Sequence, residues 1–101
     1  MHLIQILLPL ADNAGNPFPD HVLQGIHTEL SQRFGGLTAY SRAPAKGVWT
    51  QGGGQQEDDI VVVEVMARTL DERWWQDFRR RVEELLDQEE LVIRAQAMRT
   101  L

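Results

Sequence analysis

Glu64 is the only charged residue in the apolar run 60–67, which makes it the first candidate for chemistry in this sequence. A carboxylate among apolar neighbours needs a cation or hydrogen-bond donors, because an apolar environment disfavours its ionised form. Gln5 and Arg94 interrupt two further apolar segments in the same manner. If the three segments form neighbouring strands, the three polar side chains lie in a row across the sheet.

A fourth strand would add Tyr40 or Arg42 to this polar row. The row predicts a hydrogen-bonded partner for Glu64, either Arg94 or Arg42, from the same chain or from a second subunit. An arginine beside a carboxylate can orient a substrate or keep a base ionised, which is the functional interpretation. The structural interpretation is an ion pair within a hydrogen-bond ladder at a dimer interface. It is favoured because buried polar groups need partners in any case.

A second candidate site lies in the middle of the chain. Tyr40, Arg42 and Trp49, followed by the glycines 52–54, can form a rim that presents an aromatic plate and a guanidinium to a planar or anionic ligand. The competing interpretation is edge-strand packing with a solvated arginine. The candidate ligand-binding residues are therefore Gln5, Tyr40, Arg42, Trp49, Glu64 and Arg94. No catalytic residue is assigned, because no nucleophile, base and orienting group occur together.

Motifs for metals and cofactors are missing from the sequence. The absence of cysteine excludes thiol catalysis, iron–sulfur clusters and disulfides. His21 and His27 lie about 240° apart around one predicted helix, so they cannot share a metal on one face. Trp74 and Trp75 suggest a cofactor box, yet their helical spacing favours one in the core and the other at a helix seam or interface. The glycines 52–54 lack the lysine of a phosphate-binding loop. We therefore expect no metal and no cofactor.

Length and charge narrow the function classes. The chain of 101 residues has the usual size of one domain, so a single domain over 1–101 is expected. The net charge is −5, and the excess lies in residues 51–101. An acidic balance repels phosphate backbones, so no nucleic-acid partner is expected. Residues 1–9 lack the pattern of a secretory signal, and the apolar runs fall short of the roughly 20 residues that span a bilayer. We expect a cytoplasmic protein that does not enter membranes.

Periodicity predicts the order strand, helix, strand, strand, helix, strand. Predicted strands cover 3–8, 37–42 with a break at 43–47 and a resumption at 48–50, 60–67 and 91–98, and a polar turn covers 52–59. Asp20 is predicted to cap the first helix, which ends at Gly35 and Gly36. The second helix is predicted to begin with a capping box formed by Thr69 and Glu72.

This order predicts an α+β fold of the ferredoxin-like β-α-β-β-α-β type. Such a fold is a two-layer sandwich with an antiparallel sheet of order 4-1-3-2 and both helices on one face. Side-chain alternation places Ile4, Ile6, Leu8, Val61, Val63, Val65, Leu91, Ile93 and Ala95 on the helix side. The opposite side, here named the open face, carries Leu3, Gln5, Leu7, Ile60, Val62, Glu64, Met66, Val92, Arg94, Gln96 and Met98. Because this face is too apolar to meet water, a second copy or a ligand is expected to cover it.

The element order, the length and the apolar open face resemble the dimeric α+β barrel superfamily. The resemblance implies two sheets packed face to face around a central cavity, in a family that includes cofactor-independent monooxygenases, lactone isomerases and dye-decolourising peroxidases. No catalytic signature of these enzymes is present to transfer. We therefore expect a homodimeric binding or structural domain. The alternative is a cofactor-independent enzyme, monooxygenase-like or isomerase-like, acting on a small organic molecule, and a weaker possibility is a regulatory module that binds a metabolite between subunits.

Overall fold

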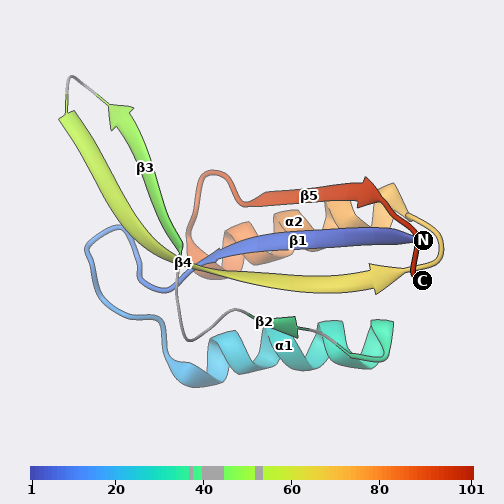
Figure 1. The fold of residues 1–101 in the computed structure, drawn as a ribbon. Coiled ribbons are helices and arrows are strands. Elements are labelled where there is room, and N and C mark those ends of the chain that lie inside the picture. The colour runs from blue at the N-terminus through green and yellow to red at the C-terminus, as the bar shows by residue number, and fades with distance from the viewer. Residues whose placement is uncertain (37, 40–44, 52–53) are drawn as a thin grey trace.

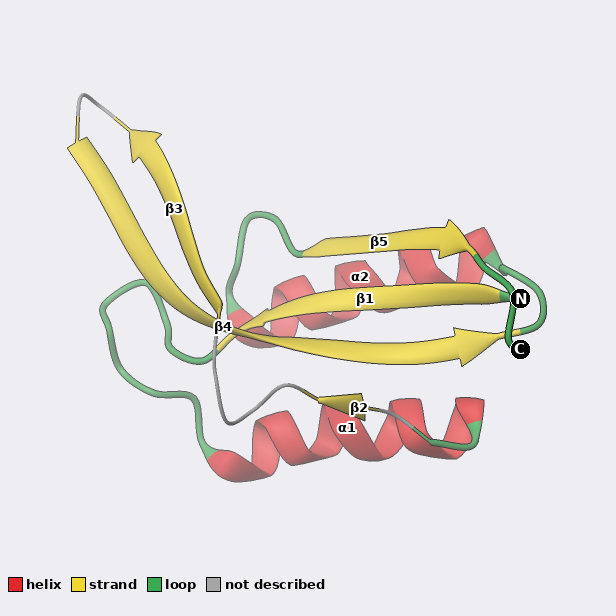
Figure 2. Cartoon of the chain, in the orientation of Figure 1, coloured by secondary structure: helices red, strands yellow, loops and turns green. Residues whose placement is uncertain are grey.

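The computed structural model describes residues 1–36, 38–39, 45–51 and 54–101, and it describes side chains for 1–36, 38 and 60–101. The elements follow the order β1 (His2–Pro9), α1 (Asp20–Phe34), β2 (Thr38–Ala39), β3 (Ala45–Gln51), β4 (Gly54–Ala67), α2 (Glu72–Leu86) and β5 (Val92–Ala97). The chain is thus a small α+β protein with an antiparallel sheet, as Figures 1 and 2 show. None of the described helices is both long and apolar enough to span a bilayer.

The sheet is built around β1, which pairs with β4 on one side and with β5 on the other, both antiparallel. The strand order is β2-β4-β1-β5. β3 pairs only with the first half of β4, so these two strands extend beyond the body of the sheet as a two-stranded arm (Figure 1). Strand β4 therefore runs from the arm into the centre of the sheet.

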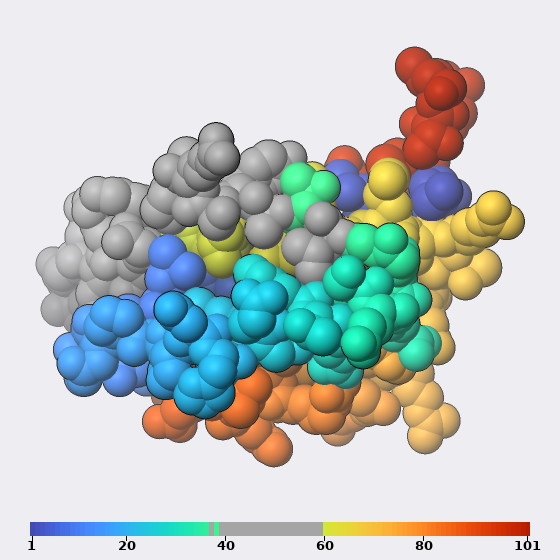
Figure 3. All heavy atoms as spheres, turned by 90° about the horizontal axis from the view of Figure 1, so that it is seen from below, coloured from blue at the N-terminus to red at the C-terminus, as the bar shows by residue number. Residues whose placement is uncertain are grey.

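One apolar core lies between the sheet and both helices. Ile26 and Leu30 of α1 pack in it with Trp75 and Phe78 of α2. The view from below in Figure 3 has α1 alongside α2. The strands supply Ile4, Ile6, Leu8, Val61, Val63 and Val65, all at 3% exposure or less. This confirms the predicted helix side of the two central strands. Burial of this apolar area is the main stabilising contribution to the fold.

The predicted N-terminal caps are wrong at both helices. Asp20 is the first residue of α1, the cap position is Pro19, and no side chain bonds there. Asp20 thus contributes only its negative charge to the first turn, where it is favourable. In α2 the cap is Asp71, whose Oδ1 accepts from the Trp74 amide at 3.1 Å. The helix begins two residues later than a box capped by Thr69 would require.

The C-terminal end of α1 follows the prediction. Gly35 adopts the left-handed conformation with φ 77°, and its amide donates to the Ser31 carbonyl. Glycine occupies this conformation without the Cβ clash that other residues meet.

The polar turn predicted over 52–59 is wrong for residues 54–59, because β4 begins at Gly54, while 52 and 53 lie outside the described residues. Residues 45–51 and 54–60 pair in register, from Ala45 with Ile60 to Gln51 with Gly54. The predicted break at 43–47 overlaps β3, which starts at Ala45, while 43 and 44 lie outside the described residues. A two-stranded ribbon is held by backbone hydrogen bonds and needs no apolar face, so its composition resembles that of a loop.

Candidate functional site

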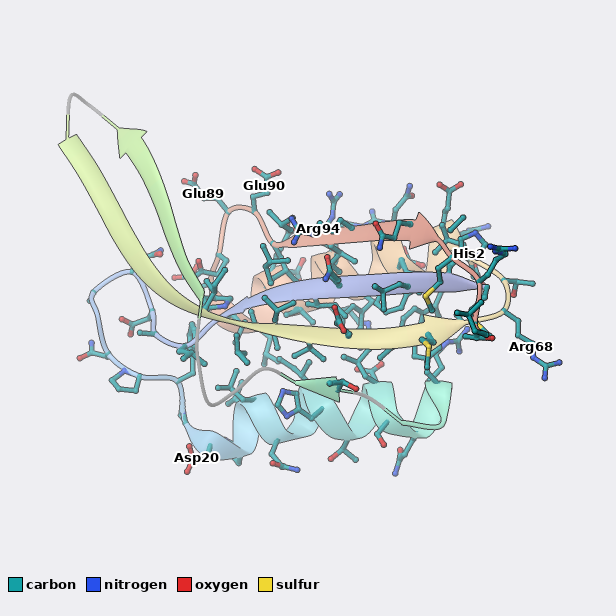
Figure 4. The ribbon with its side chains drawn as sticks, viewed as in Figure 1. His2, Asp20, Arg68, Glu89, Glu90 and Arg94 are labelled. Atoms are coloured by element: carbon teal, nitrogen blue, oxygen red, sulfur yellow. The ribbon has the colours of Figure 1, made fainter. Side chains whose placement is uncertain are left out.

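The polar row predicted from the sequence exists on the open face. Gln5 of β1 stands opposite Glu64 of β4 and opposite Arg94 of β5. Its amide bonds to both neighbours: Arg94 Nε donates to Gln5 Oε1 at 2.7 Å, and Gln5 Nε2 donates to Glu64 Oε2 at 2.7 Å. Figure 4 places Arg94 on β5 at the edge of the sheet. The row therefore runs from a cation through an amide to a carboxylate.

Arg94 was one of the two predicted partners of Glu64, and strand spacing explains why it does not bond to Glu64 directly within one chain. The other predicted partner, Arg42, lies outside the described residues. Arg94 and Glu64 lie on β5 and β4, with β1 between them. Neighbouring strands are about 4.8 Å apart, so two strand spacings separate their backbones. Gln5 fills this gap, because an amide offers an acceptor to the guanidinium and a donor to the carboxylate.

The fourth position of the row belongs to Thr38, which stands opposite Glu64 on β2. Tyr40 and Arg42, the predicted members, lie outside the described residues. Trp49 is placed by its backbone on β3, opposite Gln56. The row and Trp49 therefore lie on different parts of the sheet, the body and the arm.

The row is accessible to solvent in the single chain. Glu64 and Gln5 are half-buried and Arg94 is exposed. No polar or charged residue in the described part of the chain is fully buried. The Glu64 carboxylate, expected to be buried, is thus only half-buried in the single chain.

Apolar side chains surround the row. Leu3, Leu7 and Val62 are half-buried beside it, and two others are largely exposed, Met66 at 54% and Val92 at 45%. Two shallow hollows flank the row. One, of about 320 Å³, is lined by residues that include Leu3, Thr38, Glu64 and Met66. The other, of about 340 Å³, is lined by Leu3, Gln5, Arg94, Ala95 and Gln96.

The histidines lie apart from the row. His27 of α1 has its Nε2 buried without a hydrogen-bond partner among the described residues, and the same holds for Nδ1 of His2. Burial lowers the pKa of His27 from its ordinary value of 6.5, because the imidazolium loses hydration. Across the described ranges no three His, Cys, Asp or Glu side chains gather in a group that could hold a metal.

An aromatic cluster joins the two helices. Trp75 is buried at 6% exposure and Trp74 is half-buried at the seam with α1, in line with the expectation of one core and one seam tryptophan. Phe34 packs edge-on to Trp74 at 5.4 Å and stacks on Trp75 at 5.2 Å. Arg33 places its guanidinium 4.3 Å from the centre of the Trp74 ring. The sequence analysis did not predict this last contact. The position of Arg33 in the last turn of α1 was the only feature of the sequence that could have indicated it.

Comparison with known proteins supports the fold. No protein-family model matches the chain, and no curated protein matches it. Among solved structures, the chain is similar to the divalent cation tolerance protein CutA1 of Thermus thermophilus, with a TM-score of 0.63 and 16% identity over 97% of this chain and 84% of that one.

A phage SAM lyase is similar to the same degree. Its complex with S-methyl-5'-thioadenosine gives a TM-score of 0.62 at 15% identity, covering 94% of this chain and 79% of that one. Its apo state gives 0.61 at 15% identity, covering 94% and 78%. At these identities the likeness shows a shared small α+β fold of ferredoxin-like type, and fold alone does not fix activity.

Proposed function

We propose that this chain is a homodimeric α+β binding domain whose subunits meet through the open face. The observation that carries the proposal is the composition of that face, where apolar side chains such as Met66 and Val92 surround the polar row. Water would meet this apolar area in a single chain, and a second sheet packed about 10 Å away would bury it. The proposal includes a ferredoxin-like sheet of order 4-1-3-2, with β2 as the outer strand beside β4.

The charges of the row favour a second copy as the covering partner. Arg94 gives the row a cation at its β5 end, and Glu64 gives it a carboxylate on β4. A twofold axis near Gln5 would bring the Arg94 end of one subunit toward the Glu64 of the other. Twofold interfaces use the same patch on both subunits, so a patch that carries both charges can complement itself.

The two hollows beside the row support a role in binding small molecules. The hollow beside Arg94 lies on the open face, and the hollow beside Glu64 extends from that face to the end of α1 at Phe34, so a second subunit on the face would cover both. Ligand sites are concave and furnished with a few oriented polar groups. Thr38 and Glu64 are such groups in one hollow, and Gln5 and Arg94 are such groups in the other. The absence of cysteine suits a protein that works in the reducing cytoplasm.

The second candidate function is a cofactor-independent enzyme acting on a small organic molecule. The observation in its favour is the Gln5 amide, which orients the Glu64 carboxylate beside a hollow. A carboxylate fixed in this way can act as a general base once water is excluded. One structural neighbour is a lyase by its name, yet the low identity carries no substrate to this chain.

Analytical ultracentrifugation of the chain and of two matched variants tests the dimer. Val92→Lys places a charge on the open face, and Leu85→Lys places the same charge on α2, where Leu85 is 58% exposed. We expect the wild type and Leu85→Lys to sediment as dimers at micromolar concentration and Val92→Lys as a monomer. A monomeric wild type, or equal behaviour of the two variants, would contradict the proposal.

Native mass spectrometry of the purified dimer separates the two candidate functions. A small molecule retained at one copy per hollow would support a ligand site on the open face. A further loss of that molecule in Glu64→Gln, with the dimer intact, would favour a direct role for the carboxylate.

A further inference from the structure

A second site lies where the last turn of α1 meets the first turn of α2. Arg33 lies in the last turn of α1, and Trp74 is the third residue of α2. The Arg33 guanidinium lies 4.3 Å from the centre of the Trp74 ring and 5.8 Å from that of Phe34. A cation over an indole at this distance makes a cation–π contact. This end of the molecule is opposite the arm formed by β3 and β4 (Figure 1).

Trp74 is held rigidly by the aromatic rings around it. Phe78 stacks on it at 5.2 Å with an interplanar angle of 13°. Phe34 and Trp75 contact it edge-on, at 5.4 Å and 4.8 Å. Phe78 is fully buried, whereas Arg33 is exposed, and the face of the indole under the Arg33 guanidinium is here named its outer face. The indole is thus packed among three aromatic side chains and carries an exposed guanidinium on its outer face.

A hollow of about 530 Å³ opens beside this plate. Its lining includes Arg33, Phe34, Met66, Arg68, Asp71 and Trp74. Figure 4 places Arg68 at this end of the molecule, beyond the arrow end of β4. The hollow therefore combines an aromatic plate, an apolar wall and two guanidinium groups.

The charge of the hollow is not neutralised within the described chain. Arg33 and Arg68 form no ion pair with any described residue, whereas Arg80 and Arg81 pair with carboxylates at 2.6 Å and 2.8 Å. Asp71 also lines the hollow and contributes one carboxylate, whose Oδ1 accepts from the Trp74 amide, so the two guanidinium groups still leave a net positive charge there. On a chain with a net charge of −5, two unpaired arginines at one hollow form a local site for an anion.

We propose that this hollow binds a planar aromatic carboxylate. The ring of the ligand stacks on the outer face of Trp74, and its carboxylate is held by Arg33 and Arg68. Arg33 leaves the indole and turns to the carboxylate, because a bidentate guanidinium–carboxylate pair is stronger than its contact with the ring. The site is separate from the polar row, and it does not depend on self-association.

Calorimetric titration with 1-naphthoate tests this site, together with the indole N–H signals in a proton–nitrogen correlation spectrum. We expect saturable binding that shifts the Trp74 indole signal. The neutral 1-naphthalenemethanol is expected to bind at least about tenfold more weakly, which corresponds to losing about 1.4 kcal/mol of interaction with the carboxylate. Inorganic phosphate is expected to bind more weakly than 1-naphthoate, because it cannot use the aromatic plate.

Matched arginine variants locate the site. Arg33→Gln is expected to weaken 1-naphthoate binding about tenfold, and Arg80→Gln, the same change at another exposed arginine on α2, is expected to leave it unchanged. Trp74→Leu is expected to abolish binding, and Arg33→Gln keeps the test valid if that variant does not fold. Failure of 1-naphthoate to saturate, equal binding of the neutral alcohol or of phosphate, or an unaltered Arg33→Gln would each overturn the proposal.

Discussion

Gln5 links the two charged ends of the polar row, and its removal should affect both. Gln5→Leu leaves Arg94 without its amide acceptor and takes a donor from Glu64. Because the row is only half-buried, we expect a loss of about 1–2 kcal/mol in unfolding free energy, at the lower part of the range for groups left without partners. Urea denaturation at one fixed protein concentration measures this loss.

A double-mutant cycle separates this coupling from a general effect of the substitution. Gln5→Leu with Glu64→Leu should cost less than the two single changes added together, since the double variant leaves no half-satisfied carboxylate. Gln76→Leu on the exposed side of α2 is the control and should change stability by less than about 0.5 kcal/mol. Strict additivity of the two changes would mean that the hydrogen bond between Gln5 and Glu64 does not contribute to stability.

His27 should make the stability of the protein depend on pH. Burial lowers its pKa below 6.5 in the folded state, so the unfolded chain binds the proton more readily. Stability should therefore be full above pH 6.5 and should fall as the pH drops through the lower, folded pKa. Denaturation midpoints at pH 7.5 and pH 5.5 measure this change.

Replacement of His27 by Gln should flatten that dependence. His21, an exposed histidine at the start of the same helix, provides the matched control. Its replacement by Gln should keep the wild-type profile. If both variants retained the full pH dependence, carboxylates elsewhere in the chain would be its source.

At the scale of the elements, α1 and α2 each present one buried face to the sheet. Leu30 of α1 is fully buried, whereas Leu85 of α2 is 58% exposed. Leu30→Ala should cost about 2–5 kcal/mol, because it leaves a cavity in the core, and Leu85→Ala should cost much less. Chemical denaturation compares the two, and a larger loss for Leu85→Ala would mean that this side chain is covered by a partner.

These helices and the central strands could be predicted from the sequence, because their apolar residues recur with the spacing of a helix or of a strand. The alternation of Ile4, Ile6 and Leu8 identified the buried face before any contact was known. The caps could not be placed as reliably, because Thr69 and Asp71 offer equally good cap chemistry two residues apart. The arm was missed because β3 and the start of β4 are held by pairing with each other and carry no apolar period.

At the scale of the whole molecule, the polar row was predictable and the Arg33–Trp74 contact was not. The row follows from strand order and alternation, which bring Gln5, Glu64 and Arg94 to one register line. The fourth member of the row is set by the register of β2, which pairs with β4 at Thr38 and Ala39 only. No pattern in the sequence indicated this register. The contact between Arg33 and Trp74 depends on how the end of α1 packs against the start of α2, and no local sequence pattern predicts this arrangement.

The backbone amides of β4 should exchange their hydrogens with solvent at two different rates, because the strand has different partners along its length. Residues 61–65 lie in the sheet body, where β4 is paired with β1, and residues 54–59 are paired with β3 alone. A two-stranded ribbon opens at a small cost in free energy, whereas the centre of a packed sheet opens only with the whole domain. Hydrogen–deuterium exchange should therefore change sharply at Ile60, the residue where β4 passes from the ribbon into the sheet. Slow exchange on both sides of Ile60 would mean that another molecule holds the arm in place.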